Sequence, residues 1–308
     1  MTVKSLRIGT RGSPLALAQT RMTRAALARA HGVSEEHFTI EIIKTTGDQI
    51  QDRPLSEAGG KGLFTKELDS ALIAGAIDFA VHSSKDLPTY LPSEIVIAGF
   101  LPREDPRDAW IGRDGMTIDT LPEGAVVGTA SLRRAAQVKR KRPDLQTTLL
   151  RGNVETRLRK VKDGEIDATL LALAGLKRLG LAEHATALLS LDDFPPAAGQ
   201  GAIGLTARSN DSVTRTALTP LLDTATAQAL AAERAFLSAL DGSCRTPIAG
   251  LALVEGERLS FYGEVIKVDG GETYHVRREG RAIDAALIGA DAGKEIILRL
   301  PHGVAGLM

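Results

Sequence analysis

One strand–turn–helix signal occurs twice in this chain and constrains its fold more than any other feature. Residues 6–13 read Leu-Arg-Ile-Gly-Thr-Arg-Gly-Ser, and residues 125–131 read Ala-Val-Val-Gly-Thr-Ala-Ser. In each segment an apolar strand ends in Gly-Thr, and a serine that can cap a helix follows. A second pair of similar segments, Gly-Ala-Ile-Asp at 75–78 and Gly-Glu-Ile-Asp at 164–167, precedes a further expected strand in each half. The pattern predicts two α/β lobes of similar construction that face a shared cleft.

The chain of 308 residues is long for one domain, and its composition, 43% hydrophobic and 25% charged, is that of a globular protein. The expected fold class is α/β, with mixed sheets in two lobes and a small C-terminal α+β domain. Strands near 248–254, 258–266 and 272–278 and a last helix near 282–297 predict a three-stranded antiparallel sheet in that domain. We expect the domain boundaries to be 1–101 with 200–219 for the first lobe, 105–195 for the second lobe and 223–308 for the C-terminal domain.

Overall charge and targeting signals say little about partners. Basic and acidic residues are equal in number, 38 of each, so the net charge favours no class of ligand. No apolar run reaches the ~18 residues needed to span a membrane, and the N-terminus lacks the apolar segment of a signal peptide. Together with the single cysteine, this predicts a cytoplasmic protein.

Positive charge is concentrated between residues 133 and 160. Ten basic residues lie there, with only Asp144 and Glu155 as acidic neighbours in the sequence. Part of this charge is expected to be an ordinary solvated helix face, above all Lys139 to Arg142. The rest predicts an anion-binding surface in the second lobe.

Three arginines of this segment are expected to point into the cleft. Arg133 and Arg134 follow Thr129 and Ser131 at a helix start, and Arg151 comes directly after an expected strand, Thr-Thr-Leu-Leu. The planar guanidinium suits paired hydrogen bonds to a carboxylate or phosphate. Because no aromatic residue of the segment could stack on bases, a small polyanion is favoured over nucleic acid.

The first lobe offers a second candidate anion site. Ser13 and Pro14 begin a helix directly after Arg11, and this join aims backbone N–H groups at one spot, although a well-capped helix alone would give the same pattern. Gly59-Gly60-Lys61-Gly62, shortly before Phe64, allows mobility and close approach of the backbone to a ligand. Its spacing is not that of a phosphate-binding P-loop.

Lys85 and Asp86 come shortly after a buried-type strand expected at 77–81. Polar side chains just past the carboxyl end of a strand lie where α/β sheets bind ligands. Asp86 is therefore a candidate acid/base or cation-stabilising group. An ordinary solvated Lys–Asp pair is the alternative.

Cys244 is the only cysteine of the chain. An internal disulfide and a cysteine-rich metal site are therefore excluded. Gly242 and Pro247 place it in a loop, and the neighbouring Arg245 favours the reactive thiolate. A small buried apolar residue is the alternative, but the loop position favours a nucleophile or a covalent tether.

Seven segments, in this order, resemble the porphobilinogen deaminase (hydroxymethylbilane synthase) family of tetrapyrrole biosynthesis. The resemblance covers nearly the whole chain and rests on Arg11–Ala16, Gly59–Phe64, Val81–Pro88, Arg103–Asp108, Gly128–Arg134, Arg151–Leu158 and the Cys244 loop. It implies two lobes built like periplasmic binding proteins and a C-terminal cofactor-attachment domain. It also implies a monomeric transferase that deaminates four porphobilinogen molecules and joins them head to tail into hydroxymethylbilane.

The resemblance further implies a role for individual residues. A dipyrromethane cofactor would be attached to Cys244 by a thioether, and Asp86 would be catalytic, stabilising the cationic azafulvene left when ammonia departs. Six pyrrole rings in one cleft would carry twelve carboxylates, which calls for dense arginine. Cofactor binding is implied for Lys85, Thr129, Ser131, Arg133, Arg134 and Arg157. Substrate binding is implied for Arg11, Ser13, Phe64, Arg151, Arg178 and Gln200. No metal, nucleic-acid or membrane partner is implied.

Two other classes of protein stay open at the level of sequence. A non-enzymatic, two-lobed anion-binding module would explain the arginines and the repeated lobes, but not the Cys244 loop or the third domain. A nucleic-acid binder would explain only the charge.

Overall fold

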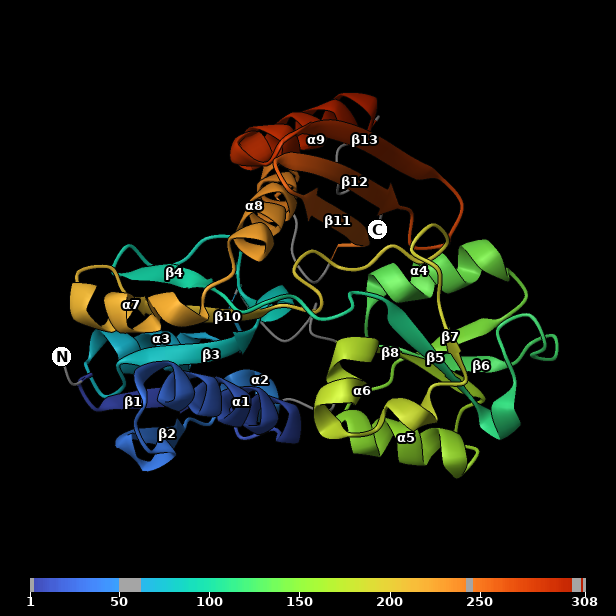
Figure 1. The fold of residues 1–308 in the computed structure, drawn as a ribbon. Coiled ribbons are helices and arrows are strands. Elements are labelled where there is room, and N and C mark those ends of the chain that lie inside the picture. The colour runs from blue at the N-terminus through green and yellow to red at the C-terminus, as the bar shows by residue number, and fades with distance from the viewer. Residues whose placement is uncertain (1–2, 50–61, 242–245, 301–305, 307–308) are drawn as a thin grey trace.

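The computed structural model describes residues 3–49, 62–241, 246–300 and 306. Within them the chain forms three sheets (Figure 1). The blue-to-cyan first lobe and the green second lobe lie side by side, and the orange-to-red C-terminal part lies above both. None of the helices in these ranges is long and apolar enough to cross a membrane.

The first lobe is built on a five-stranded mixed sheet. Its strands, in spatial order, are β2 (Phe38–Ile42), β1 (Leu6–Thr10), β3 (Phe79–Ser83), β10 (Ile203–Arg208) and β4 (Ile95–Phe100). β1 runs parallel to β2 and β3, whereas β10 runs antiparallel to β3 and β4. The helices of this part are α1 (Pro14–His31), α2 (Thr46–Gln49), α3 (Lys66–Ile73) and α7 (Ser212–Leu218). The chain thus returns, with β10, to the sheet of the first lobe after it has formed the second.

The second lobe repeats this construction. Its sheet has the order β7 (Gln146–Thr148), β6 (Val126–Gly128), β8 (Ala168–Ala172), β5 (Asp108–Gly112) and β9 (Ala187–Leu188). β6 is parallel to β7 and β8, and β5 is antiparallel to β8 and β9. Its helices are α4 (Leu132–Lys141), α5 (Val154–Lys162) and α6 (Leu173–Leu179). The duplicated pattern therefore predicted two α/β lobes of similar construction correctly, and both sheets are mixed, as the expected fold class had them.

Both predicted serine caps form. The Ser13 hydroxyl accepts a hydrogen bond from the Ala16 amide at 3.3 Å, and the Ser131 hydroxyl accepts one from the Arg134 amide at 3.4 Å. Each bond satisfies one of the free N–H groups at a helix start. The caps fix where α1 and α4 begin, and so aim both helix N-termini from the strand ends toward the space between the lobes.

Two expected strand boundaries are wrong. The strand expected at 77–81 begins at Phe79, because the Ile77 carbonyl accepts a hydrogen bond from the Arg208 guanidinium instead of joining the ladder. The strand expected at 147–150 ends at Thr148, since its partner β6 ends opposite, at Gly128. Arg151 therefore lies in the loop between β7 and α5 and not at a strand end.

The C-terminal part is the expected α+β unit. Strands β11 (Ile248–Glu255), β12 (Arg258–Ile266) and β13 (Thr273–Arg281) form an antiparallel sheet, covered by α8 (Thr224–Ala239) and α9 (Ala285–Arg299). Phe236 and Phe261 pack edge to face in its core, with 5.1 Å between their ring centres. Gly289 lets α9 cross α8 closely, because a Cβ there would lie 2.0 Å from the Ala232 carbonyl oxygen. The predicted fold class is confirmed in all three parts.

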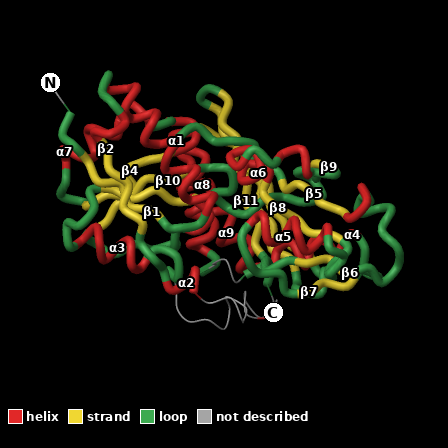
Figure 2. Tube along the Cα trace, turned by 90° about the horizontal axis from the view of Figure 1, so that it is seen from below, coloured by secondary structure: helices red, strands yellow, loops and turns green. Residues whose placement is uncertain are grey.

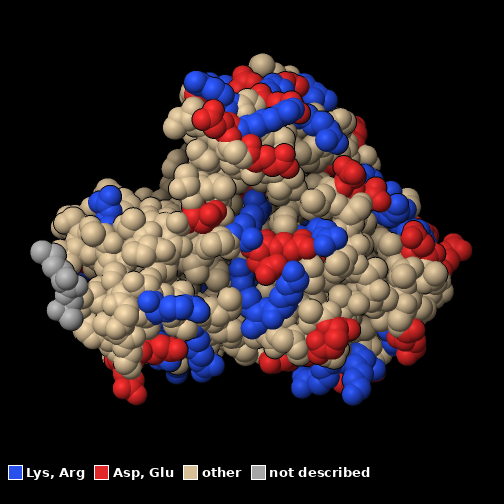
Figure 3. Space-filling model, viewed as in Figure 1, with Lys and Arg blue, Asp and Glu red and all other residues tan. Residues whose placement is uncertain are grey.

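The three parts meet around one hollow, where Figure 3 shows basic and acidic side chains gathered together. Helix α1 of the first lobe approaches α6 of the second at Leu15 and Gly175, and Figure 2 shows both helices between the two groups of strands. Arg103, on the crossover between the lobes, pairs with the buried Glu233 of α8 at 2.5 Å. The cleft is thus bordered by all three parts.

Candidate active site

A cavity of about 1110 Å³ lies between the lobes. Its wall includes the loops after β1 and β3, the starts of α4 and α5, and Ile248 at the beginning of β11. Among the described residues, the basic ones of the wall are Arg11, Lys44, Lys85, Arg133, Arg134, Arg151, Arg157 and Lys160, and the acidic ones are Asp86 and Glu155. Such an excess of cations in a concave site attracts anions strongly.

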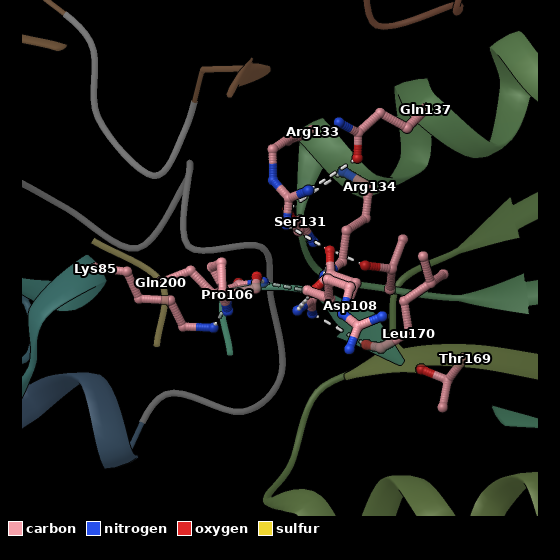
Figure 4. A network of polar contacts seen from close by, with 12 residues as sticks. Lys85, Pro106, Asp108, Ser131, Arg133, Arg134, Gln137, Thr169, Leu170 and Gln200 are labelled. Carbon is pink, nitrogen blue, oxygen red and sulfur yellow. Dashed lines mark hydrogen bonds and ion pairs between the residues drawn. The ribbon is translucent and has the colours of Figure 1, made fainter. Parts of the chain in front are cut away.

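Asp108, the first residue of β5, organises the arginines of the second lobe (Figure 4). It is fully buried and accepts hydrogen bonds from Arg133 Nη2 at 2.8 Å, from Arg134 Nη2 at 2.6 Å and from Gln200 Nε2 at 2.7 Å. Burial alone would raise the pKa of Asp108, but Arg134 and Arg133 hold that pKa well below its usual range. The carboxylate therefore stays ionised and fixes both guanidinium groups at the edge of the cavity.

The Arg133 guanidinium is held on three sides. Its Nη1 donates to Gln137 Oε1 and to the Pro195 carbonyl, both at 2.8 Å, and its Nη2 binds Asp108. Its Nε is buried and has no hydrogen-bond partner. A buried donor without a partner costs stability until an acceptor binds it. This atom is therefore suited to an acceptor carried by a bound anion.

Lys85 follows β3 in a short 3-10 turn, Ser84–Asp86, and its Nζ donates to Gln200 Oε1 at 3.3 Å. Through Gln200 it joins the Asp108 network from the other lobe (Figure 4). Burial, and next the charge of Arg134, lower the pKa of Lys85 to about 8. The positive charge of the Lys85 ammonium is thus only partly offset by acidic groups of the protein, and a bound anion would stabilise it.

Arg151 and Arg157 add two more guanidinium groups to the same wall. Arg157 Nε donates to the Gly152 carbonyl at 3.0 Å, which directs the side chain back over the start of α5. Burial, and then the charges of Arg134 and Arg151, lower the pKa of Arg157 to about 10. Like charges held this close repel each other, so a polyanion between them would relieve the repulsion.

Asp86 faces the cavity from the first lobe, with 32% of its side chain exposed. Its carboxylate lies 3.5 Å from Arg11 Nη1. The Arg11 guanidinium in turn lies over the Phe64 ring, 4.1 Å from the ring centre. Asp86 thus combines an accessible carboxylate with a fixed cation and an aromatic face, and the cation at 3.5 Å is Arg11, not the Lys85 of the alternative solvated pair.

Most predicted site residues border the cavity, including Ser13, Ser131 and Gln200. Thr129 and Arg178 are not among its lining residues. The Thr129 hydroxyl accepts from the Ser131 amide at 3.1 Å and so shapes the turn before α4, and Arg178 Nη2 donates to the Gly201 carbonyl at 2.6 Å. Cys244 and Gly59–Lys61 lie outside the described residues. The binding roles of all these residues stay predictions.

Neither Asp108 nor Gln137 was expected from the sequence to be a site residue. Asp108 entered the sequence analysis only as the last residue of the Arg103–Asp108 segment, whereas in the structure it begins a fully buried strand. The signal was present: an acidic residue directly before Ala-Trp-Ile is a charge entering a core, and buried charges are paired. Gln137 gave no such signal, since it lies in a basic helical segment.

Fold and site together define a class of protein: a two-lobed α/β protein with an arginine-lined cleft that is suited to anions and is bordered by a C-terminal α+β part. Among solved structures, a YaeC-family lipoprotein from Enterococcus faecalis is 13% identical, with a TM-score of 0.42 and coverage of 71% of this chain and 91% of its own. A periplasmic binding protein from Salmonella typhimurium is 12% identical, with a TM-score of 0.41 and coverage of 73% and 94%.

Sequence comparisons give the family. Residues 6–216 match the family model "Porphobilinogen deaminase, dipyromethane cofactor binding domain", and residues 227–297 match "Porphobilinogen deaminase, C-terminal domain". Curated proteins named porphobilinogen deaminase from Nitrobacter hamburgensis and Nitrobacter winogradskyi are each 57% identical over 289 residues, which is 94% of this chain and 92% of theirs. The chain belongs to the porphobilinogen deaminase family. The expected enzyme class, a transferase of tetrapyrrole biosynthesis with a dipyrromethane cofactor, is confirmed.

The cleft fits this cofactor. Each pyrrole ring of a dipyrromethane carries carboxylate side chains, and the second-lobe wall offers the buried Arg133 Nε as a donor without a partner. Arg134, Arg151 and Arg157 border the same cavity, where an anion would offset their mutual repulsion. The two alternative classes, a non-enzymatic module and a nucleic-acid binder, account for neither family match.

Proposed function

We propose that this chain polymerises four porphobilinogen molecules into hydroxymethylbilane in the cleft between its lobes, on a dipyrromethane attached to Cys244. The observation that carries the proposal is the arginine wall of the cleft, where burial and the charges of Arg134 and Arg151 lower the pKa of Arg157, so that bound carboxylates would stabilise the guanidinium groups. The bound dipyrromethane would supply the free pyrrole α-carbon from which the chain grows. Water would release the finished product.

Asp86 would be the catalytic group. When porphobilinogen loses ammonia, a positive charge spreads over the pyrrole ring and its nitrogen. A carboxylate beside that nitrogen stabilises the charge and can take up and return a proton. The accessible Asp86 oxygen, 3.5 Å from Arg11, supports this role, because Arg11 keeps the carboxylate in one orientation while leaving it exposed to the cleft.

The remaining predicted residues would bind different pyrrole rings, some those of the cofactor and some those of the substrate. Because Arg133 and Arg134 are fixed by Asp108, they are suited to a cofactor that stays in place through every turnover. The other proposed cofactor ligands are Lys85, Thr129, Ser131 and Arg157. Incoming and elongating rings would be bound by Arg11, Ser13, Phe64, Arg151, Arg178 and Gln200.

We further propose the three-domain division at the boundaries expected from the sequence, 1–101 with 200–219, 105–195 and 223–308. The membership of β1–β4 and β10 in one sheet, of β5–β9 in a second and of β11–β13 in a third supports it. A monomeric state and a cytoplasmic location also stay predictions.

Arg157, besides binding the cofactor, would also hold rings as the growing chain shifts, and Arg157→Leu tests this stepwise use of the arginines. A charge-assisted hydrogen bond contributes about 1.5–3 kcal/mol, enough to stall one elongation step without abolishing earlier ones. With excess porphobilinogen the variant should accumulate covalent species of intermediate length, visible by denaturing mass spectrometry as a ladder spaced by one deaminated pyrrole. Arg159→Leu, the same change at an exposed position of α5 outside the cavity wall, is the control and should match the wild type. The same distribution of species in all three proteins would contradict the proposal.

The pKa of Lys85 predicts a pH dependence. Because burial lowers this pKa to about 8, the ammonium charge is present below pH 8 and is lost above it. A bound carboxylate raises the pKa again, so the affinity of the cofactor-free protein for its anionic ligand should fall about tenfold per pH unit just above pH 8. The loading rate of cofactor-free protein with porphobilinogen, followed from pH 7 to pH 9, measures this. Lys85→Arg stays charged and should flatten the profile; an unchanged profile would show that Lys85 is not the titrating group.

A further inference from the structure

Helix α4 is joined at its last turn to the C-terminal sheet by an ion pair whose carboxylate is buried. Arg140 Nη1 lies 2.7 Å from Glu264 Oε2, and Glu264, on β12, is only 2% exposed. The Tyr262 hydroxyl donates to the same Glu264 oxygen at 2.9 Å. Arg140 also donates to the Asp193 carbonyl, on the segment that leads back toward the first lobe. The solvated face predicted for Lys139 to Arg142 is therefore wrong at Arg140.

A glycine contact accompanies this ion pair. Gly270, in the turn between β12 and β13, has φ of +80°, and a Cβ there would lie 2.5 Å from the Arg140 amide nitrogen. The turn thus rests directly on the backbone of α4. An ion pair and a close backbone contact hold the same sheet on the same helical turn, without sharing a side chain.

The two ends of α4 carry different contacts. Its first turn carries Arg133 and Arg134, bound to Asp108 at the wall of the cleft. Its last turn carries Arg140, bound to β12. In the sequence Cys244 stands four positions before β11, and in that strand Ala249 lies opposite Glu264 in register. One rigid helix therefore connects the arginines to the strand pair that follows the attachment residue.

We propose that Glu264 is a positioning residue of the polymerisation reaction: through Arg140 it holds the C-terminal domain on α4, so that the attached primer stays aligned with Arg133 and Arg134. This inference rests on the proposed attachment at Cys244 and the proposed cofactor role of the two arginines. Glu264 touches no reacting group. It acts by fixing the distance between the tether and the cofactor-binding wall.

Alignment of this kind affects turnover more than substrate binding. A displacement of about 1 Å between reacting groups costs up to roughly a hundredfold in rate. Porphobilinogen, in contrast, would be bound by residues of the two lobes, which the Arg140–Glu264 pair does not touch. Loosening the pair should therefore lower kcat per bound cofactor and leave KM nearly unchanged.

Two substitutions loosen the contact in different ways, and each has a matched control. Glu264→Gln removes the buried charge, and Glu279→Gln makes the same change in the exposed Arg258–Glu279 pair of the same sheet. Gly270→Ala adds a methyl group against α4, and Gly256→Ala adds one at another positive-φ turn glycine of the domain, where no atom lies within 4 Å. The Gly256 control thus shares the backbone strain but not the clash.

The experiment measures kcat divided by covalently bound dipyrromethane, KM, and hydrogen exchange of residues 262–266. Glu264→Gln and Gly270→Ala should each lower kcat per cofactor about tenfold or more relative to their controls, with KM within about twofold and faster exchange in β12. Unchanged kcat per cofactor in both variants, including the case where only the amount of folded protein falls, overturns the proposal. Failure of the attachment at Cys244 would appear separately, as an unmodified mass of the wild type.

Discussion

Asp86→Asn is expected to lower turnover about a hundredfold or more while the protein still folds and binds its cofactor. The amide keeps the size of the side chain but removes the negative charge that would stabilise the azafulvene cation. Folding should survive because Asp86 is partly exposed and its ion pair with Arg11 is long, at 3.5 Å. Steady-state kinetics with porphobilinogen, normalised to bound cofactor, measures the effect.

Glu155→Gln is the matched control for this variant. Of the described residues that line the cleft, Glu155 is the other one with a carboxylate, and it is exposed in the first turn of α5. Its replacement should change turnover less than about threefold. If Asp86→Asn also turned over within about threefold of the wild type, which is under ~1 kcal/mol of barrier, Asp86 would not be the catalytic carboxylate.

Cys244→Ser is expected to abolish covalent attachment of the cofactor altogether. A thioether requires the sulfur, and the chain has no second cysteine that could replace it. Serine is close in size, so the protein should fold with nearly the thermal stability of cofactor-free wild type. The intact mass under denaturing conditions should equal that of the bare chain. Ser243→Ala, a change at the neighbouring residue that leaves the thiol in place, should keep the full adduct.

The architecture was predictable from local signals. The Gly-Thr strand ends and the serine caps at Ser13 and Ser131 depend on residues close together in the sequence, and both caps form as predicted. The alternation of short apolar strands and turn residues likewise gave the C-terminal sheet. Predictions of this kind succeed because strand periodicity and helix capping are properties of short segments.

The hydrogen bonds and ion pairs within the site were not predictable from such local signals. Asp108 binds Arg133, Arg134 and Gln200, which come from distant parts of the sequence, and only the folded chain brings them together. The sequence showed the arginines as free cations, whereas two of them share a buried counterion. They are fixed in place and still carry more charge than the protein neutralises.

The basic run at the end of α4 shows the same limit. Lys139 to Arg142 looked like a solvated face because no acidic residue precedes it at helical spacing. Glu264, the partner of Arg140, lies 124 positions further along the chain, on β12 between Gly263 and Val265. An ion pair between segments that are far apart in the sequence produces no periodic pattern in either segment, so local spacing could not predict it.

The most direct test of the account is the intact mass of the protein under denaturing conditions, before and after addition of porphobilinogen. The wild type as purified should exceed the mass of the bare chain by about two pyrrole units, and brief exposure to substrate should add a series of up to four further units, each lacking ammonia. Cys244→Ser should show neither. A wild-type mass equal to the bare chain that does not change with porphobilinogen, or the same adducts in Cys244→Ser, would contradict chain growth on a primer tethered at Cys244.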